Sequence, residues 1–207
     1  MPLEPNQRPV PGQRKLLSTD RQASTIPKGG TDGTWLYPSP QMFFNALRRK
    51  DKGEDVVEDD MASVIFAHNS MNELTWQHVL RWESLHRDAC CEPRLSRFRG
   101  RPDDLSPLAR LKSWTGGPLP FDRHDWYVDR CGEEVRYVID FYFDDDKAGT
   151  PEAFGLTVRP ALDSPGAALD RTKMFIYTQF AKYGLPCPVT GHPSTVGVQE
   201  PGEQQQA

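Results

Sequence analysis

No run of apolar residues in this sequence is long enough to cross a bilayer. None of its 207 residues lies in a stretch near the roughly 18 consecutive apolar residues that a membrane helix needs. The first residues also lack the apolar segment of a secretory signal, so we expect a protein that is soluble or bound to a membrane surface. The chain has no phosphate-cradling glycine loop, no H-E-x-x-H pair and no G-x-S-x-G elbow. The common NTPase, zinc-protease and hydrolase functions therefore have no support.

Cysteine is scarce. The four cysteines are Cys90, Cys91, Cys131 and Cys187, and no two of them form a C-x-x-C pair. This spacing suggests neither a zinc knuckle nor a disulfide framework, and it predicts reduced thiols. The formal net charge of −4 argues against bulk attraction to nucleic acid, so no nucleic-acid partner is expected.

Large apolar residues are few at both ends of the chain. Residues 1–33 are rich in Pro, Gln, Ser, Thr and Gly, and residues 185–207 return to that composition. We therefore expect a flexible N-terminal arm and a flexible C-terminal tail. The ten Phe and five Trp of the chain supply the buried surfaces of one folded domain, which we place at residues 34–184.

Helix signals dominate the first half of that domain. A capping serine followed by proline starts a predicted helix at residues 39–50. Apolar residues at i, i+3 and i+4 in residues 61–68 predict a second helix, with His68 on its apolar face. Ser70 and Glu73 match the S-x-x-E capping box, so we expect a break after His68 and a new helix start.

Loop and strand patterns dominate the second half. We expect a long ordered loop region at 94–125 with a short helix at 105–112. Two strands are expected at 135–143 and 154–159, joined by a turn at 144–151. A final helix is expected at 164–183, followed by Gly184. The fold class is therefore α+β, a single domain with a small antiparallel sheet, several helices, long ordered loops and flexible termini.

His68 offers the most specific chemistry in these patterns. A neutral imidazole is a good iron ligand, because one ring nitrogen offers a lone pair while an acceptor fixes the N–H of the other. Asn69, Asn72 and Glu73 lie beside it in the sequence and supply such acceptors. From these residues alone, a packed core histidine and a capping glutamate are the commoner roles. Trp76 is likewise more often a core residue than a cofactor contact.

A basic segment interleaved with aromatic residues follows. Its members are Arg94, Arg97, Arg99, Arg101, Arg110, Lys112, Arg123 and Arg130, with Phe98, Trp114, Phe121 and Trp126 between them. Guanidinium groups pair with carboxylates or phosphates while rings stack, so this composition suits a planar aromatic ligand with acidic groups. Haem with its two propionates, nucleotides and single-stranded RNA all fit, as does a solvated basic loop.

Several long motifs occur in order along the chain. They are Trp35-Leu-Tyr-Pro-Ser-Pro-Gln-Met-Phe-Phe-Asn-Ala, His68-Asn-Ser-Met-Asn-Glu-Leu-Thr-Trp76, Leu80-Arg-Trp-Glu-Ser-Leu-His86, the run from Leu119 through Arg-His-Asp-Trp126 and Asp-Arg-Cys-Gly132 to Asp140, and Val158-Arg-Pro-Ala-Leu-Asp-Ser164. Together they cover about residues 17–177, and they resemble the mitochondrial holocytochrome c synthase (cytochrome c haem lyase) family.

The resemblance implies roles for particular residues. The histidine of the family's H-N-x-x-N-E-x-x-W motif, here His68, is expected to be the axial ligand of the haem iron, and His68 and Glu73 are the expected catalytic residues. The expected haem-binding residues are His68, Asn72, Trp76, Trp114, Arg123, His124, Trp126 and Arg130. The family also carries Cys-Pro haem-regulatory motifs in its N-terminal arm. Here the only such string is Cys187-Pro188, a possible regulatory site in the tail.

The resemblance also implies an activity and a location. The expected reaction adds the two thiols of the Cys-x-x-Cys-His motif of apocytochrome c across the haem vinyl groups, so haem and apocytochrome c are the expected substrates and partners. The expected location is the mitochondrial intermembrane space, peripheral on the inner membrane. A non-catalytic haem carrier or sensor that binds through His68 and Cys187 is the alternative, and an RNA-binding module is a weaker one.

Overall fold

The structure is a computed structural model that describes residues 7–49, 57–150 and 153–185. The expectations for the C-terminal tail, including Cys187, lie outside the described residues. The chain divides into two compact units, residues 1–161 and 162–207. No helix in the described part of the chain is both long enough and apolar enough to span a membrane.

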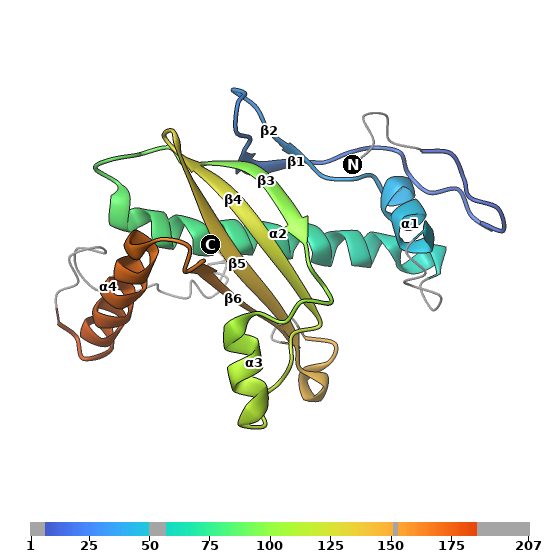
Figure 1. Cartoon of the computed structure of the whole chain (residues 1–207). Helices are drawn as coiled ribbons and strands as arrows, with labels where there is room; N and C mark the ends of the chain where they lie inside the picture. The colour runs from blue at the N-terminus through green and yellow to red at the C-terminus, as the bar shows by residue number, and fades with distance from the viewer. Residues whose placement is uncertain (1–6, 50–56, 151–152, 186–207) are drawn as a thin grey trace, which may run out of the picture. The chain divides into compact units, whose positions relative to one another are not determined.

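The first unit contains nearly all of the secondary structure (Figure 1). Its elements are β1 (Ala23–Pro27), β2 (Thr34–Leu36), α1 (Pro40–Arg49), α2 (Met61–Glu83), β3 (Arg94–Gly100), α3 (Pro107–Trp114), β4 (Asp122–Arg130), β5 (Glu133–Phe143) and β6 (Phe154–Pro160), with short 3₁₀ turns η1 (Glu58–Asp60), η2 (Ser84–His86) and η3 (Asp145–Lys147). The predicted α+β class is confirmed.

Four antiparallel strands in the order β3-β4-β5-β6 form the main sheet. β4 and β5 are joined by a tight hairpin in which Cys131 has φ 49° and Gly132 has φ 101°. Two consecutive positive φ angles are what a two-residue type I′ hairpin requires, and this turn matches the right-handed twist of its strands. The predicted strands at 135–143 and 154–159 are confirmed as β5 and β6.

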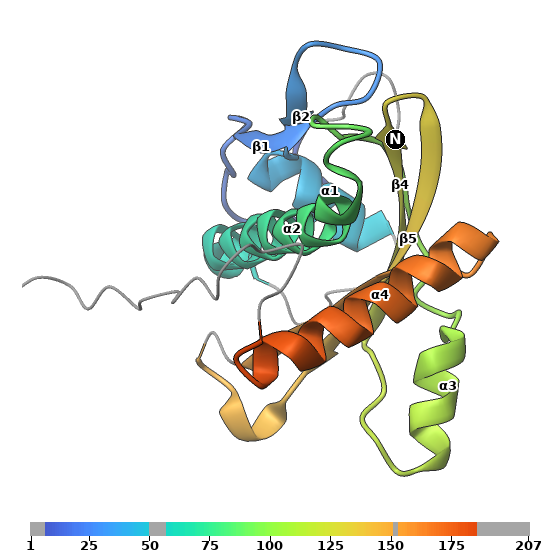
Figure 2. The same cartoon turned by 90° about the vertical axis from the view of Figure 1, so that its left-hand side faces the viewer.

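The two faces of this sheet differ in chemistry. Figures 1 and 2 show α2 crossing one face, and the core lies between them because side chains alternate across a strand. The core residues are Ile26, Trp76, Val79, Leu95, Trp126, Val128, Tyr137, Ile139, Phe141 and Val158. The indole N–H of Trp82 in α2 also donates to Val158 O, 2.8 Å away. The other face carries charged residues of β4 and β5, among them Asp125 and Asp140.

The strand β1 lies inside the segment for which composition predicted a flexible arm. It pairs with β2, and Ile26 is only 2% exposed in the core. The reason is a single short alternation, in which Ser24 and Ile26 point inward and their neighbours outward. One buried isoleucine and a few backbone hydrogen bonds are enough to order a segment whose average composition is polar.

The predicted break after His68 is wrong. α2 runs without interruption from Met61 to Glu83, so His68 lies inside a helix. Ser70 and Glu73 match a capping box only by spacing, and both lie inside the helix. The Glu73 carboxylate accepts hydrogen bonds from β1 and from Tyr37 instead. A sequence pattern cannot distinguish a cap from a tertiary contact that uses the same residue type.

The expected loop region at 94–125 is partly regular. β3 and the start of β4 lie within it. These strands were not predicted because their arginines occupy a charged sheet face, which has no apolar pattern in the sequence. The short helix is confirmed as α3, where Ser106 Oγ accepts from Ala109 N at 3.1 Å. The helix α1 also starts as predicted, since Ser39 Oγ accepts from Met42 N at 3.2 Å.

The second unit consists, in its described part, of α4 (Pro165–Lys182) and its flanks. Ser164 Oγ caps the helix by accepting from Ala167 N at 3.2 Å. Gly184 has φ 68° just beyond its end, the left-handed conformation that terminates many helices. The predicted final helix is confirmed, but it forms a unit of its own.

Cys90 and Cys131 form a disulfide with a Cα–Cα distance of 5.6 Å, while Cys91 is free and exposed. The prediction of reduced thiols is therefore wrong for two of the four cysteines. The two are 41 residues apart in sequence, and only the β4–β5 hairpin brings them together. Motif spacing does not contain that information.

Candidate functional site

The His68 side chain lies on the side of α2 that also carries the buried Thr75 and Val79, which follow at i+7 and i+11. Two aromatic rings meet its imidazole edge-on. Phe43 of α1 is 4.9 Å away between ring centroids, and Tyr37 is 6.1 Å away. The predicted position on the inner face of a helix is confirmed, and segments distant in sequence enclose the ring.

A chain of amides fixes the orientation of this imidazole. His68 Nδ1 lies 3.1 Å from Asn69 Oδ1, and an amide oxygen only accepts, so Nδ1 carries the proton. Asn69 is itself buried, and its Nδ2 donates to Gln22 Oε1 at 3.1 Å. The remaining ring nitrogen, Nε2, therefore holds the lone pair. An outer acceptor that fixes the tautomer is the arrangement found around metal-binding histidines.

Asn72 contacts the same ring from the next helical turn. Its Nδ2 donates to the backbone oxygen of His68 at 2.7 Å and lies 3.3 Å from Nε2 and 3.5 Å from Nδ1. An amide on the axis of the Nε2 lone pair would be much farther from Nδ1 than from Nε2. Asn72 therefore lies beside the ring, and the lone-pair direction stays clear of it.

The surroundings of His68 favour its neutral form. Burial lowers the pKa of His68 below its usual 6.5, the hydrogen bond to Asn69 opposes this shift, and the charge of His124 adds to it. A buried imidazole is disfavoured as a cation because the low-dielectric surroundings solvate charge poorly. Near neutral pH the side chain is thus in the state that can bind a metal.

Glu73 supports the site through hydrogen bonds to β1 and Tyr37. Its carboxylate accepts from Thr25 N at 3.0 Å, from the Thr25 hydroxyl, and from the Tyr37 phenol at 2.8 Å. Burial, together with the hydrogen bond and charge of Glu73, raises the pKa of Tyr37, so the phenol remains a donor. Glu73 holds β1 and Tyr37 against α2, and its described contacts do not include the imidazole.

His124 lies on the sheet and is the second predicted haem-site histidine. It lies near the start of β4, on the face that carries Trp126 two residues later. Its Nε2 is 3.2 Å from Asp122 Oδ2, and its ring meets Phe141 edge-on with 5.4 Å between centroids. Its Nδ1 is buried and has no hydrogen-bond partner among the described residues. The charge of His124 also lowers the pKa of His68.

The three predicted tryptophans have different positions. Trp76 and Trp126 are 3% and 1% exposed and belong to the core, so neither indole presents a face for stacking. Trp114 is 84% exposed at the end of α3. None of the three has a described contact with His68. Two of them support the sheet and α2, as aromatic residues at helical or strand spacing usually do.

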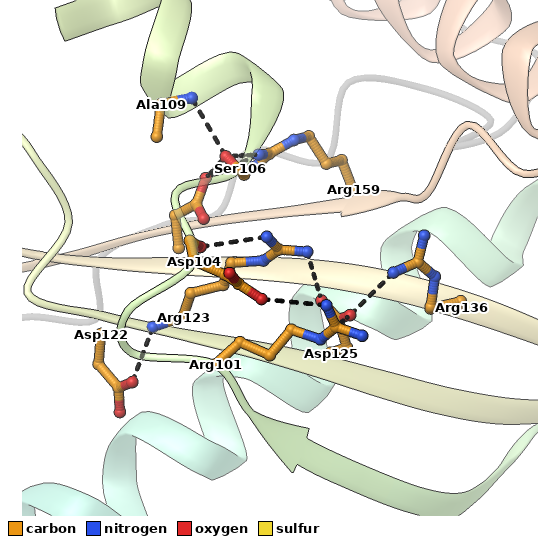
Figure 3. A network of polar contacts seen from close by, with 10 residues as sticks. Arg101, Asp104, Ser106, Ala109, Asp122, Arg123, Asp125, Arg136 and Arg159 are labelled. Atoms are coloured by element: carbon orange, nitrogen blue, oxygen red, sulfur yellow. Dashed lines mark hydrogen bonds and ion pairs between the residues drawn. The ribbon is translucent and has the colours of Figure 1, made fainter.

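Arg123 points to the charged face of the sheet, opposite to that of its neighbour His124. Its guanidinium donates to Asp104 O at 3.1 Å and to Asp125 Oδ1 at 3.0 Å. Figure 3 shows the Asp125 carboxylate within a set of guanidinium groups, including those of Arg101 and Arg136. Arg123 is thus committed to an internal network and does not face His68.

Arg130 lies at the other end of β4, on the face that packs on α2. It forms a two-pronged pair with Glu83, at 2.7 and 3.0 Å. Tyr137 donates to the same carboxylate at 2.5 Å, and burial and the charge of Glu83 raise the pKa of this phenol. The predicted haem-binding residues are therefore spread over several parts of the fold, and Asn72 is the one with a described contact to His68.

Sequence reasoning missed three contributors to the site: Gln22, Tyr37 and Phe43. Tyr37 and Phe43 stand in a motif that was noted without assigning them a role, and Gln22 lies in the expected flexible arm. That motif is the sequence signal for Tyr37 and Phe43, and Gln22 has none. Among the described residues, no three His, Cys, Asp or Glu side chains gather in a way that could hold a metal ion.

Comparison with known proteins decides the family. The model of a family described as "Cytochrome c/c1 heme lyase" matches residues 1–175. The chain belongs to the cytochrome c/c1 haem lyase family. The expected resemblance is thereby confirmed, and His68 lies within the matched part of this haem lyase family member.

Curated relatives of this haem lyase family member come from animals and fungi. The chain is 49% identical over 177 residues to a "Holocytochrome c-type synthase" of Gallus gallus, covering 82% of this chain and 64% of the relative. It is 49% identical over 174 residues to the protein of that name from Bos taurus, covering 82% and 63%. It is 44% identical over 190 residues to a "Holocytochrome-c synthase" of Saccharomyces cerevisiae, covering 80% and 70%. The chain thus spans somewhat less than two thirds of the two vertebrate proteins. No solved structure matches it.

Proposed function

We propose that this haem lyase family member attaches haem covalently to the Cys-x-x-Cys-His motif of apocytochrome c. Each cysteine thiol adds across one haem vinyl group, so that sulfur bonds to the carbon next to the ring and hydrogen to the terminal carbon. The substrate supplies the nucleophiles, and the protein supplies placement. The observation that carries the proposal is the oriented, neutral imidazole of His68 in a family named for this activity.

His68 is the proposed axial ligand of the substrate haem. Its Nδ1 proton is held by Asn69 and its Nε2 lone pair is clear of Asn72, so Nε2 is the atom that would bind iron. The histidine of the substrate motif would bind the opposite face of the iron. That second bond would hold both substrate thiols beside the haem vinyl groups, so that the reacting atoms are aligned before the addition.

Glu73 is proposed as a positioning residue, acting through Tyr37. The hydrogen bond between them fixes the aromatic ring that borders His68. His124 is proposed to line the haem site, since its charge acts on His68 and its buried Nδ1 has no hydrogen-bond partner among the described residues. Arg123 and Arg130 are not assigned to the propionates, because their guanidinium groups already pair with carboxylates of the protein. Trp76 and Trp126 support the site as core residues.

We also propose that the protein works in the mitochondrial intermembrane space, peripheral on the inner membrane. This location is the one that the resemblance of the sequence motifs to the mitochondrial family implies. The disulfide between Cys90 and Cys131 agrees with a compartment in which disulfides persist, since thiols stay reduced in the cytosol. Cell fractionation tests it: the protein should be released from membranes by alkaline carbonate and should be reached by protease only after the outer membrane is opened.

Co-expression with apocytochrome c in a bacterial host that lacks its own cytochrome c maturation tests the function. The wild-type chain should yield haem that stays on the cytochrome after acid-acetone extraction, whereas a non-catalytic haem carrier should yield none. His68→Ala should abolish attachment and the six-coordinate haem spectrum of the purified protein. His78→Ala is the matched control, since His78 lies on the same helix and its pKa is also lowered by burial. Normal holocytochrome yield from His68→Ala would refute the assignment.

A further inference from the structure

Three cysteines gather at the end of α2 that lies away from His68. Cys90 follows the η2 turn, is 5% exposed, and is bonded to Cys131 at the exposed tip of the β4–β5 hairpin. Cys91 is exposed and free. From His68 to the end of α2 at Glu83 the helix extends roughly 20 Å. The cysteines are therefore separate from the proposed haem site.

The junction around this disulfide is also held without it. Glu83 at the end of α2 binds Arg130, the residue before Cys131, through two hydrogen bonds, and Tyr137 adds a third. The hairpin has its own closure, in which Asp129 Oδ1 accepts from Gly132 N at 2.6 Å. Because these contacts fix α2 to the hairpin, the disulfide can open while both cysteines stay close together.

We propose that Cys90 and Cys131 are a reversible dithiol/disulfide couple that reduces the oxidised Cys-x-x-Cys segment of the apocytochrome substrate. This inference rests on the proposed function for the identity of the substrate. Two substrate thiols that have oxidised to a disulfide cannot add to vinyl groups. An enzyme that needs both thiols free gains from a dithiol that restores them.

Every sulfur bond broken or formed in the exchange belongs to this protein or to the substrate. The Cys131 thiolate attacks one sulfur of the substrate disulfide, a mixed disulfide forms, and one substrate thiolate leaves and takes up a proton. The Cys90 thiolate then attacks Cys131, which forms the bond present in the structure and releases the second substrate thiol. Two electrons pass from the protein to the substrate. A small-molecule thiol of the glutathione class would reduce the couple for another turn.

The positions of the cysteines assign these roles. Cys131 is an exposed residue at a hairpin tip, where an extended peptide can reach it, so it is the attacking residue. Cys90 is buried and bonded to Cys131, so it is the resolving residue. Cys91 is exposed but lies outside the bond, which makes it the matched control for an accessible thiol that is not part of the couple.

The test uses the full chain without haem, so its result does not depend on attachment. The protein is reduced, freed of reductant and mixed with an oxidised Cys-x-x-Cys-His peptide. Mass spectrometry then counts peptide thiols and maps the protein disulfides. We expect about one peptide disulfide reduced per chain, with formation of the Cys90–Cys131 bond. Glutathione disulfide as the probe should react more slowly than the oxidised Cys-x-x-Cys-His peptide, because it lacks the substrate sequence.

The variants separate the roles. Cys90→Ser should accumulate a mixed disulfide between the peptide and Cys131, Cys131→Ser should stop the transfer, and Cys91→Ser should react like wild type. Three results would overturn the inference: no transfer above the protein-free blank, a transfer that depends on Cys91, or loss of the folded circular-dichroism signal when the wild-type protein is reduced. Normal haem attachment together with any of these would leave the proposed function standing and remove this inference alone.

Discussion

Asn69 Oδ1 accepts the Nδ1 proton of its neighbour His68. Consecutive residues on a helix do not face each other, so this contact needs a further support. Gln22 supplies it by accepting from the Asn69 amide. The orientation of a proposed iron ligand thus depends on a residue of the N-terminal segment. That dependence makes Asn69 the most direct place to test the site without removing the ligand.

Asn69→Leu should weaken haem binding while His68 remains. Without the acceptor the imidazole loses its fixed tautomer, and loss of such an outer partner typically lowers metal affinity or activity by about 10 to 100-fold. Haem titration followed by absorption spectroscopy measures this. Asn45→Leu is the control, because Asn45 is also a buried amide but lies on α1 and hydrogen-bonds to Gln41. Equal losses in both variants would mean that only stability had changed.

Glu73→Gln and Tyr37→Phe should act as a unit. Each removes part of the same hydrogen bond, so the double variant should lose little more haem affinity than either single variant. Haem titration of the three variants gives the coupling. If Glu73 itself transferred a proton in the reaction, Glu73→Gln would lower holocytochrome yield far more than Tyr37→Phe while leaving haem affinity the same.

The stability of the protein should fall at acid pH in a way that depends on His68. Its pKa in the folded state is lowered from 6.5 by burial, so above pH 6.5 both states hold the neutral ring. As the pH falls from 6.5 through the folded pKa, the unfolded state takes up the proton first and stability decreases, by at most about 1.4 kcal/mol per pH unit for one group. Urea unfolding across this range should show a smaller decrease for His68→Gln than for wild type. An unchanged slope would contradict the burial of a neutral imidazole.

Glu83→Gln should be strongly destabilising. It removes the carboxylate charge that pairs with the buried guanidinium of Arg130, and breaking a buried pair in this way costs roughly 3 kcal/mol or more. Chemical denaturation measures the loss. Glu134→Gln is the control, because its pair with Arg97 is solvent-exposed and such pairs contribute little. A near-neutral Glu83→Gln would mean that α2 and the hairpin are held mainly by packing.

The sequence predicted the elements whose signals are local. The helix starts at Ser39 and Ser164 and the alternation of β5 depend only on neighbouring residues. It failed where a residue serves a distant partner. Glu73 carries a capping pattern but binds β1 and Tyr37, and Cys90 finds Cys131 only through the sheet.

In the candidate site, too, local signals were predicted from the sequence and contacts between distant residues were not. His68 was found because a long motif contains it, and its inward position because helical spacing is local. Arg123 and Arg130 were grouped with it because both are basic and lie in one stretch. In the fold, alternation along β4 and the length of the strand place them on opposite faces and at opposite ends. Composition can therefore predict a type of ligand without locating its site.

The alternation along β4 makes that strand a partition between two different environments. His124 and Arg123 are adjacent in the chain, yet one lies on the sheet face that carries Trp126 and the other belongs to the ion-pair network of Figure 3. A shift of the strand by one residue would exchange every side chain between the faces. It would bring a guanidinium to the side of His68 and bury an indole among charges. Natural variants of this family should therefore tolerate insertions in the segment before β4, where a loop absorbs them, and exclude a single inserted residue within the strand itself.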